Sequence, residues 1–373
     1  MAPRGSSAPA AASSVAPTTA TSAGGYTSKS GEWRPSYPAR YGPLFAWPRL
    51  RQPLEVLKWL FLYPGYLAPW NAIYLGLVLA SLEFTQPPTA AFAAPSAEAA
   101  SPFARAAAAL LARNLALLWL IAGGWHLILY TLRLQGSERK YDPSPQLVGE
   151  EARRKGFLFD SQVYDNVFWS CCSGVPVWTA FEVLFFWALA TGRLPAWAVV
   201  RTWSEAPVYN AVWLLCIPFW RELHFYLGHR ALHIKSLYPL VHYLHHKNSN
   251  PGPWSGLAMH PVEHVVYFSV VLIHFVVPSH PIHFLFNAQH TALTPSGGHH
   301  GYEGPIVNGW IPTGSYFHYL HHRYFGAFRL VSTPKNKKPA PRVDFGPRPS
   351  PRAHTFPPLL SRRSKLRRRH SAA

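Results

Sequence analysis

Cysteine and charged residues are both scarce in this sequence. The 373 residues include three cysteines, Cys171, Cys172 and Cys216, and no Cys-x-x-Cys pair. An odd count without that spacing excludes a disulfide framework and argues against a sulfur-ligated zinc or iron–sulfur site. Only 14% of the residues are charged and 49% are hydrophobic, whereas about a quarter of the residues of ordinary soluble domains are charged. This balance predicts a membrane protein with several spans and polar ends.

Acidic residues are also few. The chain has 16 Asp and Glu against 35 Lys and Arg, for a net charge of +19. Thirteen of the basic residues and one Asp lie in residues 327–373, a Pro- and Arg-rich tail that we expect to be disordered. No nucleic-acid-binding motif accompanies this charge. Because the rest of the chain is apolar, a membrane surface is a better candidate partner than nucleic acid.

The N-terminal segment, residues 1–46, has no apolar periodicity. It is rich in Ala, Ser, Thr, Pro and Gly, a composition typical of disorder. It contains no apolar core of the kind found in a cleaved secretory signal. A plastid or mitochondrial transit peptide is an alternative, because the segment is Ser-rich and poor in acids.

Six apolar segments follow, and they predict an all-α fold, an integral membrane helical bundle. A full span needs about 20 residues, so we interpret the last two segments as a short re-entrant or tilted pair. The segments are 59–82 (interrupted at 64–69), 106–132, 176–190, 208–227, 265–277 and 282–288.

Basic residues between these segments predict the orientation. Arg49, Arg51 and Lys58 precede the first span, and six more Lys and Arg lie between residues 133 and 155. Basic loops favour the cytosolic side, which places both termini and every histidine cluster there. We expect a first transmembrane hairpin and cytosolic loop at 47–165, a catalytic domain at 166–326, and then the tail.

Histidine is concentrated in one part of the chain. Seventeen of the 20 histidines lie between His224 and His322. The first box is His229-x-x-x-His233, the second box is His242-x-x-His245-His246, and the third box is His318-x-x-His321-His322. His260 and His264 form a further i, i+4 pair. Because residues three or four apart share one face of a helix, each box directs its imidazoles the same way.

The number of boxes predicts two metal ions close together, since a zinc site takes only four ligands. Imidazole suits Zn, Cu, Fe and Ni. Only Glu263 and Glu303 are acidic in the histidine-rich window, with Glu222 just before it, so a carboxylate di-iron bundle is excluded. The absence of HExxH excludes a zincin peptidase. A histidine-rich di-iron centre beside a membrane is favoured, because iron is redox-active and zinc is not.

Isolated histidines need no metal. We interpret His126, His274, His280 and His283 as core residues, and we leave His224 and His264 open between ligand and structural roles. A flexible metal-buffering loop is another possible source of a His-rich region. Here, however, the boxes alternate with aromatic residues and lie at the ends of spans.

From about Trp220 to Tyr324 the sequence resembles the sterol desaturase / fatty acid hydroxylase superfamily of membrane di-iron oxygenases. The resemblance rests on Glu222 seven residues before His229-Arg230, the three boxes, His260-Pro261-x-Glu263 and His299-x-Gly301-Tyr302-Glu303. By position, it implies that the iron ligands are His229, His233, His242, His245, His246, His260, His299, His318, His321 and His322. It also makes Glu222, Glu263 and Glu303 candidates for orienting these ligands.

The resemblance implies an activity as well. Such proteins are endoplasmic-reticulum enzymes that use O2 at two iron ions to hydroxylate or desaturate a lipid. Their electrons come from NAD(P)H through a reductase and a b-type cytochrome. We therefore expect an oxidoreductase that acts on a sterol or long-chain lipid, similar to sterol C-5 desaturases. A plastid membrane is the alternative location.

One departure from the family keeps rival interpretations open. After Tyr324-Phe325 the family usually continues with Asn-Tyr-Gly and later Trp-Asp and Phe-Gly-Thr, whereas this chain becomes rich in Arg, Lys and Pro. A catalytically decayed, metal-binding relative is therefore the alternative to an active enzyme. A metal transporter is disfavoured, because the boxes cluster on one side. We interpret the loop 250–256 as a plain connector rather than the substrate entrance.

Overall fold

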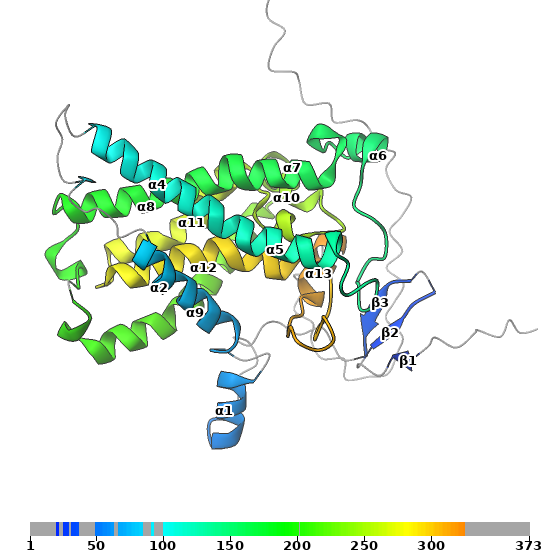
Figure 1. Cartoon of the computed structure of the whole chain (residues 1–373), viewed down its shortest axis with the longest axis horizontal. Coiled ribbons are helices and arrows are strands. Elements are labelled where there is room, and N and C mark those ends of the chain that lie inside the picture. The colour runs from blue at the N-terminus through cyan, green and yellow to red at the C-terminus, as the bar shows by residue number, and fades with distance from the viewer. Residues whose placement is uncertain are drawn as a thin grey trace, which may run out of the picture. The chain divides into compact units, whose positions relative to one another are not determined.

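The structure is a computed structural model of the chain (Figure 1). It describes residues 20–21, 25–29, 31–36, 49–62, 66–84, 91–92, 100–200 and 202–324. The chain divides into two compact units, residues 1–328 and 329–373, and all described residues belong to the first. The tail that we expect to be disordered, 327–373, lies outside the described residues.

A small antiparallel sheet stands in the N-terminal segment. Its strands are β1 (Ala20–Thr21), β2 (Gly25–Thr27) and β3 (Trp33–Pro35), paired in that order. Trp33 is 2% exposed, its N–H donates to the Lys140 carbonyl, and its ring lies 6.4 Å from that of Tyr141. The expectation of disorder over 1–46 does not hold for these strands, because a distant apolar partner covers Trp33.

The remaining described residues are mainly helical, as the sequence predicts. In chain order the α-helices are α1 (Pro53–Phe61), α2 (Trp70–Phe84), α4 (Ala100–Leu118), α5 (Gly124–His126), α6 (Gly149–Arg154), α7 (Gln162–Trp169), α8 (Val175–Ala190), α9 (Pro207–Leu232), α10 (Tyr243–His246), α11 (Pro261–Phe268), α12 (Pro281–His299) and α13 (Tyr316–Tyr324). Short π and 3-10 turns join or flank them: η3 (Trp119–Gly123), η4 (Leu127–Thr131), η5 (Leu158–Asp160), η6 (Ser170–Gly174), η7 (Ala196–Ala198), η8 (Trp203–Glu205), η9 (Tyr238–His242), η10 (Pro253–Leu257) and η11 (Ser269–Phe275).

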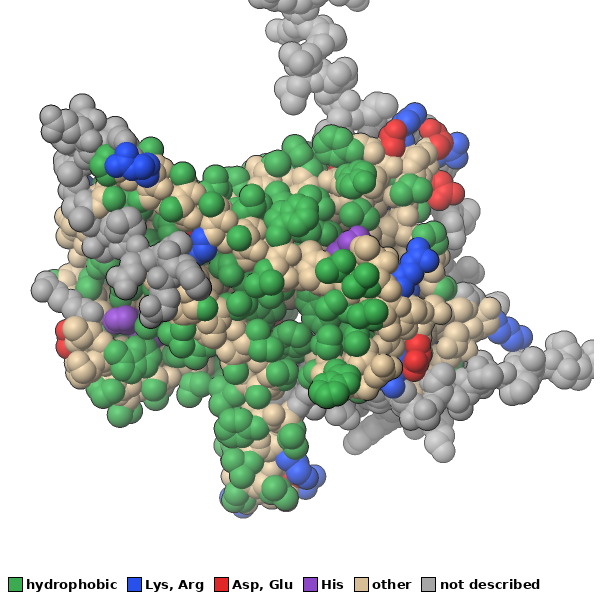
Figure 2. Space-filling view, viewed as in Figure 1, with side chains coloured by type: hydrophobic (Ala, Val, Ile, Leu, Met, Phe, Trp, Pro, Cys, Tyr) green, Lys and Arg blue, Asp and Glu red, His purple; other side chains and the backbone are tan. Residues whose placement is uncertain are grey.

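Two helices among the described residues are long and apolar enough to cross a bilayer. One runs over Pro102–Thr131, from α4 to η4, and the other over Gln162–Ala190, from α7 to α8. At 1.5 Å per residue each is about 45 Å long, against roughly 30 Å for the hydrocarbon core. Trp119 and Leu120 are exposed on the first, and hydrophobic side chains cover much of the face in Figure 2. Because length and composition alone support a crossing, the membrane bundle stays a prediction.

The first predicted span, 59–82, is divided in the structure. α1 ends at Phe61, and α2 begins at Trp70. Tyr66, which precedes α2, lies against the end of α1, because its N–H donates to the Trp59 carbonyl at 2.7 Å. The two apolar halves are therefore separate helices.

The last predicted segment, 282–288, is part of the 19-residue helix α12. The apolar pattern of the sequence indicates only the first part of this helix, because its C-terminal half is polar. Those polar side chains are buried and paired: Gln289 Nε2 donates to Ser81 Oγ, and His290 Nε2 lies 2.7 Å from Asn71 Oδ1. Their partners lie about 200 residues earlier in the chain, outside any local pattern.

α12 is the central helix of the bundle and packs against α2, α4, α8 and α9 (Figure 1). Phe284 stacks on Phe185 of α8, with ring centroids 4.0 Å apart, and both side chains are buried. η10, which is buried throughout, packs against α12 as well. The loop 250–256, expected to be a plain connector, therefore contributes to the core.

A buried ion pair joins the two long helices. Arg113 of α4 and Glu182 of α8 form a salt bridge, with side chains 7% and 0% exposed. Glu182 also accepts hydrogen bonds from Trp178 Nε1 and Asn114 Nδ2. Because an unpaired buried charge is costly, this contact fixes which faces of α4 and α8 meet.

The close approach of η10 to α12 depends on Gly256. A Cβ at this position would lie 2.5 Å from the carbonyl carbon of Pro295, so Gly256→Ala must push the two backbones apart. We expect Gly256→Ala to lower the free energy of unfolding by about 1–3 kcal/mol. The measurement is the thermal unfolding midpoint of the detergent-purified protein. Gly76→Ala in α2 is the control, since a Cβ there meets nothing within 4 Å. Equal effects of the two substitutions would contradict this packing.

Candidate metal centre

Nine of the ten histidines implied as ligands meet where α9, α10, α12 and α13 approach one another. The first box lies on the last turn of α9, with His233 as its C-cap. The second box spans η9 and α10, and the third box lies on α13. His299 is the last residue of α12. The helical spacing of each box thus brings its imidazoles to the place where these helix ends meet.

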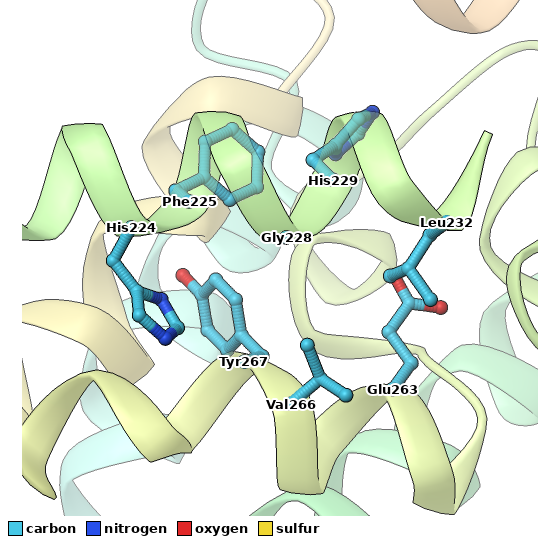
Figure 3. A pocket seen from close by; sticks show the side chains of 8 residues that line it. All are labelled: His224, Phe225, Gly228, His229, Leu232, Glu263, Val266 and Tyr267. Carbon is cyan, nitrogen blue, oxygen red and sulfur yellow. The ribbon is translucent and has the colours of Figure 1, made fainter. Parts of the chain in front are cut away.

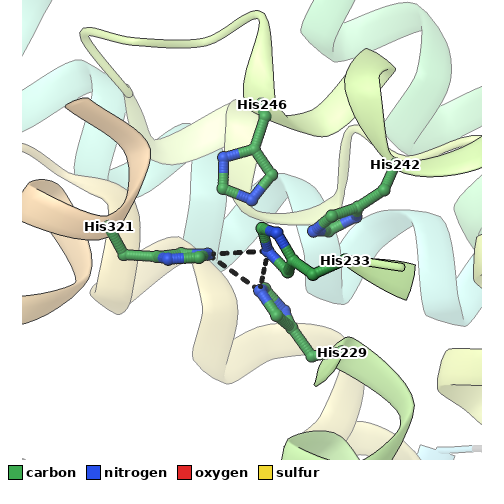
Figure 4. Close-up of side chains that lie close together, drawn as sticks. All are labelled: His229, His233, His242, His246 and His321. Atoms are coloured by element: carbon green, nitrogen blue, oxygen red, sulfur yellow. Dashed lines mark hydrogen bonds between the residues drawn. The ribbon is translucent and has the colours of Figure 1, made fainter. Parts of the chain in front are cut away.

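The first group contains five imidazoles. One ring nitrogen from each lies within 4.8 Å of the others, and four of the five side chains are buried. The Nε2 atoms of His229, His233 and His321 are 2.8–3.3 Å apart. Figure 4 shows the rings facing a common centre. The members are His229, His233, His242, His246 and His321.

The second group contains four imidazoles, His245, His299, His318 and His322, whose ligand nitrogens also lie within 4.8 Å of one another. His299 lies at its middle. Its Nε2 is 2.9 Å from that of His318, 3.1 Å from that of His322 and 3.4 Å from that of His245.

Backbone carbonyls fix the tautomers of two members of the second group. The Nδ1 of His299 lies 2.7 Å from the Pro295 carbonyl, and the Nδ1 of His245 lies 3.3 Å from the Ala258 carbonyl. Because a carbonyl oxygen only accepts, each Nδ1 carries the proton and each Nε2 carries a lone pair. The two lone pairs therefore face each other at 3.4 Å. A cation between them resolves this repulsion.

The nitrogen spacing fits metal ions. Metal–imidazole bonds are about 2.0–2.1 Å long, which puts neighbouring ligand nitrogens about 3.0 Å apart around an octahedral ion and about 3.4 Å apart around a tetrahedral one. Three nitrogen pairs in each group are separated by 2.8–3.4 Å, and all the ligand nitrogens of a group lie within 4.8 Å of one another. An all-imidazole donor set suits Fe, Zn, Cu and Ni. The residues therefore fit two such ions, one in each group.

Burial keeps these imidazoles neutral. It lowers the pKa of His242 and His245 to about 3 and that of His233 and His318 to about 4. Burial, and then the charges of neighbouring imidazoles, also lower the pKa of the other five, His229, His246, His299, His321 and His322. Neutral imidazole is the form that binds metal, so the site is poised for it at neutral pH.

Glu263 is a predicted carboxylate that touches a ligand histidine. Its Oε1 lies 2.7 Å from His242 Nδ1, and the side chain is buried on the first turn of α11. Burial raises the pKa of Glu263 to about 8. When Glu263 is ionised, its Oε1 accepts a hydrogen bond from the Nδ1–H of His242, and the lone pair of His242 Nε2 is then free for the first group. That Nε2 has no hydrogen-bond partner among the described residues.

The other two predicted carboxylates act elsewhere. Glu303 accepts from the Tyr141 hydroxyl at 2.5 Å, and the N–H of Ser315, just before α13, donates to the same hydroxyl oxygen. Glu303 therefore supports the start of the helix that carries the third box. Glu222 forms a salt bridge with Arg221.

His260 lies outside both groups. It is the N-cap of α11, and its Nδ1 accepts from the Val262 N–H at 3.2 Å. Pro261 at the first helical position suits the same start. The side chain is half-buried, so the structure gives His260 a capping contact and leaves its role as a ligand without support.

The histidines that the sequence leaves open, or assigns to the core, make protein contacts. His264 uses both ring nitrogens, donating to the Leu257 carbonyl and accepting from Ser173. His224 Nε2 lies 3.0 Å from Ser269 Oγ. Core contacts to Ser279, Asn287 and Asn210 likewise engage His274 and His283. These contacts favour a structural role for all four.

Sequence reasoning missed a buried polar network behind the second box. Lys247, which follows His246, has its Nζ 2.8 and 3.0 Å from the two carboxylate oxygens of Asp165. Asn248 Oδ1 accepts from Gln162 and Asn166 of α7. The local signal is the three polar residues Gln162, Asp165 and Asn166 within α7. This network ties the second box to α7.

A small hollow opens between α9 and α11 beside the first group (Figure 3). Phe225, Gly228 and Val266 line it, with His229 and Glu263 at one end. Its volume of about 10 Å³ holds about one water molecule. The hollow is therefore too small for a lipid chain.

Comparison with known proteins identifies the region that contains these histidines. Residues 213–333 match the fatty acid hydroxylase family model, a segment that includes all nine grouped histidines. Curated relatives include a Delta(7)-sterol 5(6)-desaturase from Candida glabrata, 31% identical over 29% of this chain and 29% of the relative. The resemblance to the sterol desaturase / fatty acid hydroxylase superfamily is confirmed for this segment.

Other relatives differ in their named reaction. A very-long-chain aldehyde decarbonylase from Oryza sativa is 28% identical over 42% of this chain and 58% of its own length. A putative Delta(7)-sterol-C5(6)-desaturase from Arabidopsis thaliana is 30% identical over 32% of this chain and 42% of its own length. The chain thus spans less than two thirds of each of these relatives. No solved structure matches it significantly.

The network behind the second box predicts a specific sensitivity. Asp165→Asn leaves the Lys247 cation buried without its counter-charge, and breaking a buried pair costs about 3–5 kcal/mol. We expect a clear drop in the thermal unfolding midpoint of the detergent-purified protein. Asp160→Asn is the matched control, because its pair with Arg153 is exposed and such pairs add little stability. A similar small change in both variants would contradict the role given to Asp165.

Proposed function

We propose that this protein is a membrane-bound, O2-dependent di-iron oxidoreductase that hydroxylates or desaturates a lipid, a sterol or another long-chain lipid. The observation that carries the proposal is the pair of adjacent all-imidazole groups, in one of which two buried lone pairs face each other. The family match and the relatives named as sterol desaturases support the choice of a lipid.

The proposed ligands are the nine grouped histidines, five for one ion and four for the other. Iron bound there supplies redox chemistry with O2 that can remove hydrogen from an unactivated C–H bond. Zinc fits the same nitrogen donors but is redox-inert, which is why we propose iron.

The chain's own residues prepare the site by placing protons. The carbonyls of Ala258 and Pro295 hold the Nδ1 protons of His245 and His299, so that each Nε2 lone pair turns inward. Ionised Glu263 does the same for His242. Such partners of a ligating histidine fix its ring orientation and raise its basicity. The side chains of His242, His245 and His299 are buried among the surrounding helices, and this burial keeps water away from their nitrogens.

The two long apolar helices support a membrane location. We propose the endoplasmic reticulum, with the histidine groups and both termini on the cytosolic side, because basic residues flank the apolar segments there. The proposed catalytic domain is 166–326. The electron donors we propose are NAD(P)H, a reductase and a b-type cytochrome, and these rest on the resemblance alone.

Metal analysis tests the centre directly. We expect about two iron ions per chain in the detergent-purified protein, measured by elemental analysis, and a loss of both in His245→Ala. His260→Ala is the matched control and should keep its metal, because His260 lies outside both groups. Metal-free wild-type protein, or equal loss in the two variants, would contradict the assigned ligands.

Lipid analysis tests the reaction. Cells that express the wild-type chain should accumulate a hydroxylated or desaturated lipid only when O2 is supplied, whereas His245→Ala cells should not. His260→Ala cells should resemble the wild type. Bound metal without any O2-dependent product would instead favour the decayed, metal-binding relative.

A further inference from the structure

α1 presents an uncovered apolar face. The helix buries none of its side chains. Leu54, Leu57 and Phe61 are 65%, 52% and 53% exposed, and at spacings of three and four residues they share one side of the helix. Leu50 and Leu62, at its two ends, are 75% and 60% exposed. Figure 2 shows hydrophobic side chains over much of α1.

α1 is too short to cross a bilayer, and it does not join another helix to do so. Its nine residues extend about 14 Å, less than half of the hydrocarbon core. Tyr66 and Leu67 then lie back against the end of α1, since their N–H groups donate to the carbonyls of Trp59 and Leu60. The apolar face therefore does not continue into α2.

The direction of α1 is held by aromatic packing. Tyr66 stacks between Trp59 of α1 and Phe219 of α9, with ring centroids 5.1 and 4.7 Å apart. The Tyr66 hydroxyl also donates to the Leu215 carbonyl. This packing engages the side of α1 that carries Trp59 and leaves the Leu54–Phe61 side open.

Basic side chains border the open face. Arg49, Arg51 and Lys58 are all exposed, and Glu55 is the only acidic residue of the helix. An apolar stripe flanked by cations is complementary to an anionic lipid surface. We propose that α1 docks in the plane of an anionic membrane surface, its apolar face among the acyl chains and its cations at the headgroups. This inference rests on the proposed membrane location.

A depth measurement on the full chain tests the proposal. The three cysteines are replaced by serine, and Leu57→Cys carries an environment-sensitive fluorophore. The protein is reconstituted in phosphatidylcholine vesicles with or without phosphatidylserine. Glu150→Cys, on the exposed surface of α6, is the control. We expect nitroxides near the headgroups to quench the Leu57 label several-fold more than the control, and phosphatidylserine to strengthen that quenching. Arg49→Glu, Arg51→Glu and Lys58→Glu together should abolish the effect of phosphatidylserine.

Three results would overturn the proposal. A Leu57 label quenched by aqueous iodide as strongly as the control would place the face in water. Stronger quenching from the bilayer centre would make α1 part of a span. A signal that changes only with protein concentration would mean that a second copy covers the face. Release of the whole chain from vesicles by an alkaline wash would contradict the proposed membrane location itself, whereas retention with an aqueous label contradicts only the role of α1.

Discussion

Repulsion among buried nitrogen lone pairs is the constraint on which the rest of this structure depends. His245 and His299 cannot donate to each other, because carbonyl oxygens already hold their Nδ1 protons. Neutral imidazoles also cannot escape the repulsion by protonation, since burial lowers their pKa values. A cation bound among these nitrogens satisfies such an arrangement, and positive charge nearby also favours the ionised form of Glu263. The nitrogen donors, the tautomers and the burial of these imidazoles therefore all favour the binding of a cation.

Holding that arrangement together is the work of contacts outside the two groups. The pair of Lys247 and Asp165 secures the second box to α7, and the chain of contacts from Glu303 through Tyr141 reaches the start of α13. Buried pairs of this kind add little net stability compared with apolar packing. Their value here lies in geometry, because each fixes the position of a helix end that carries imidazoles. The apolar core around α12 supplies the cohesion.

The sequence predicts where the histidine boxes lie and that they are helical. It does not predict which imidazole belongs to which of the two groups. The i, i+4 and i, i+3 spacings are local, so the helical faces of the first and third boxes follow from them directly. Which imidazole enters which group depends on the rotation of α10 relative to α9 and α13, which no spacing records. His260 illustrates this: its motif suggests a ligand, but the proline after it starts a helix, and the ring becomes a cap. Lys247 and Trp33 also find partners about 80 and 108 residues away, beyond any local pattern.

The second and third boxes each divide their imidazoles between the two groups. His242 and His246 belong to the first group while His245 belongs to the second, and His321 is separated in the same way from His318 and His322. In the proposed two-ion centre, one turn of helix would therefore serve both ions. Filling one position would order the turn that carries donors for the other, so the proposal implies that the two ions are taken up cooperatively. A half-loaded protein would then be the least populated form, and loss of one ion would weaken the hold on its neighbour.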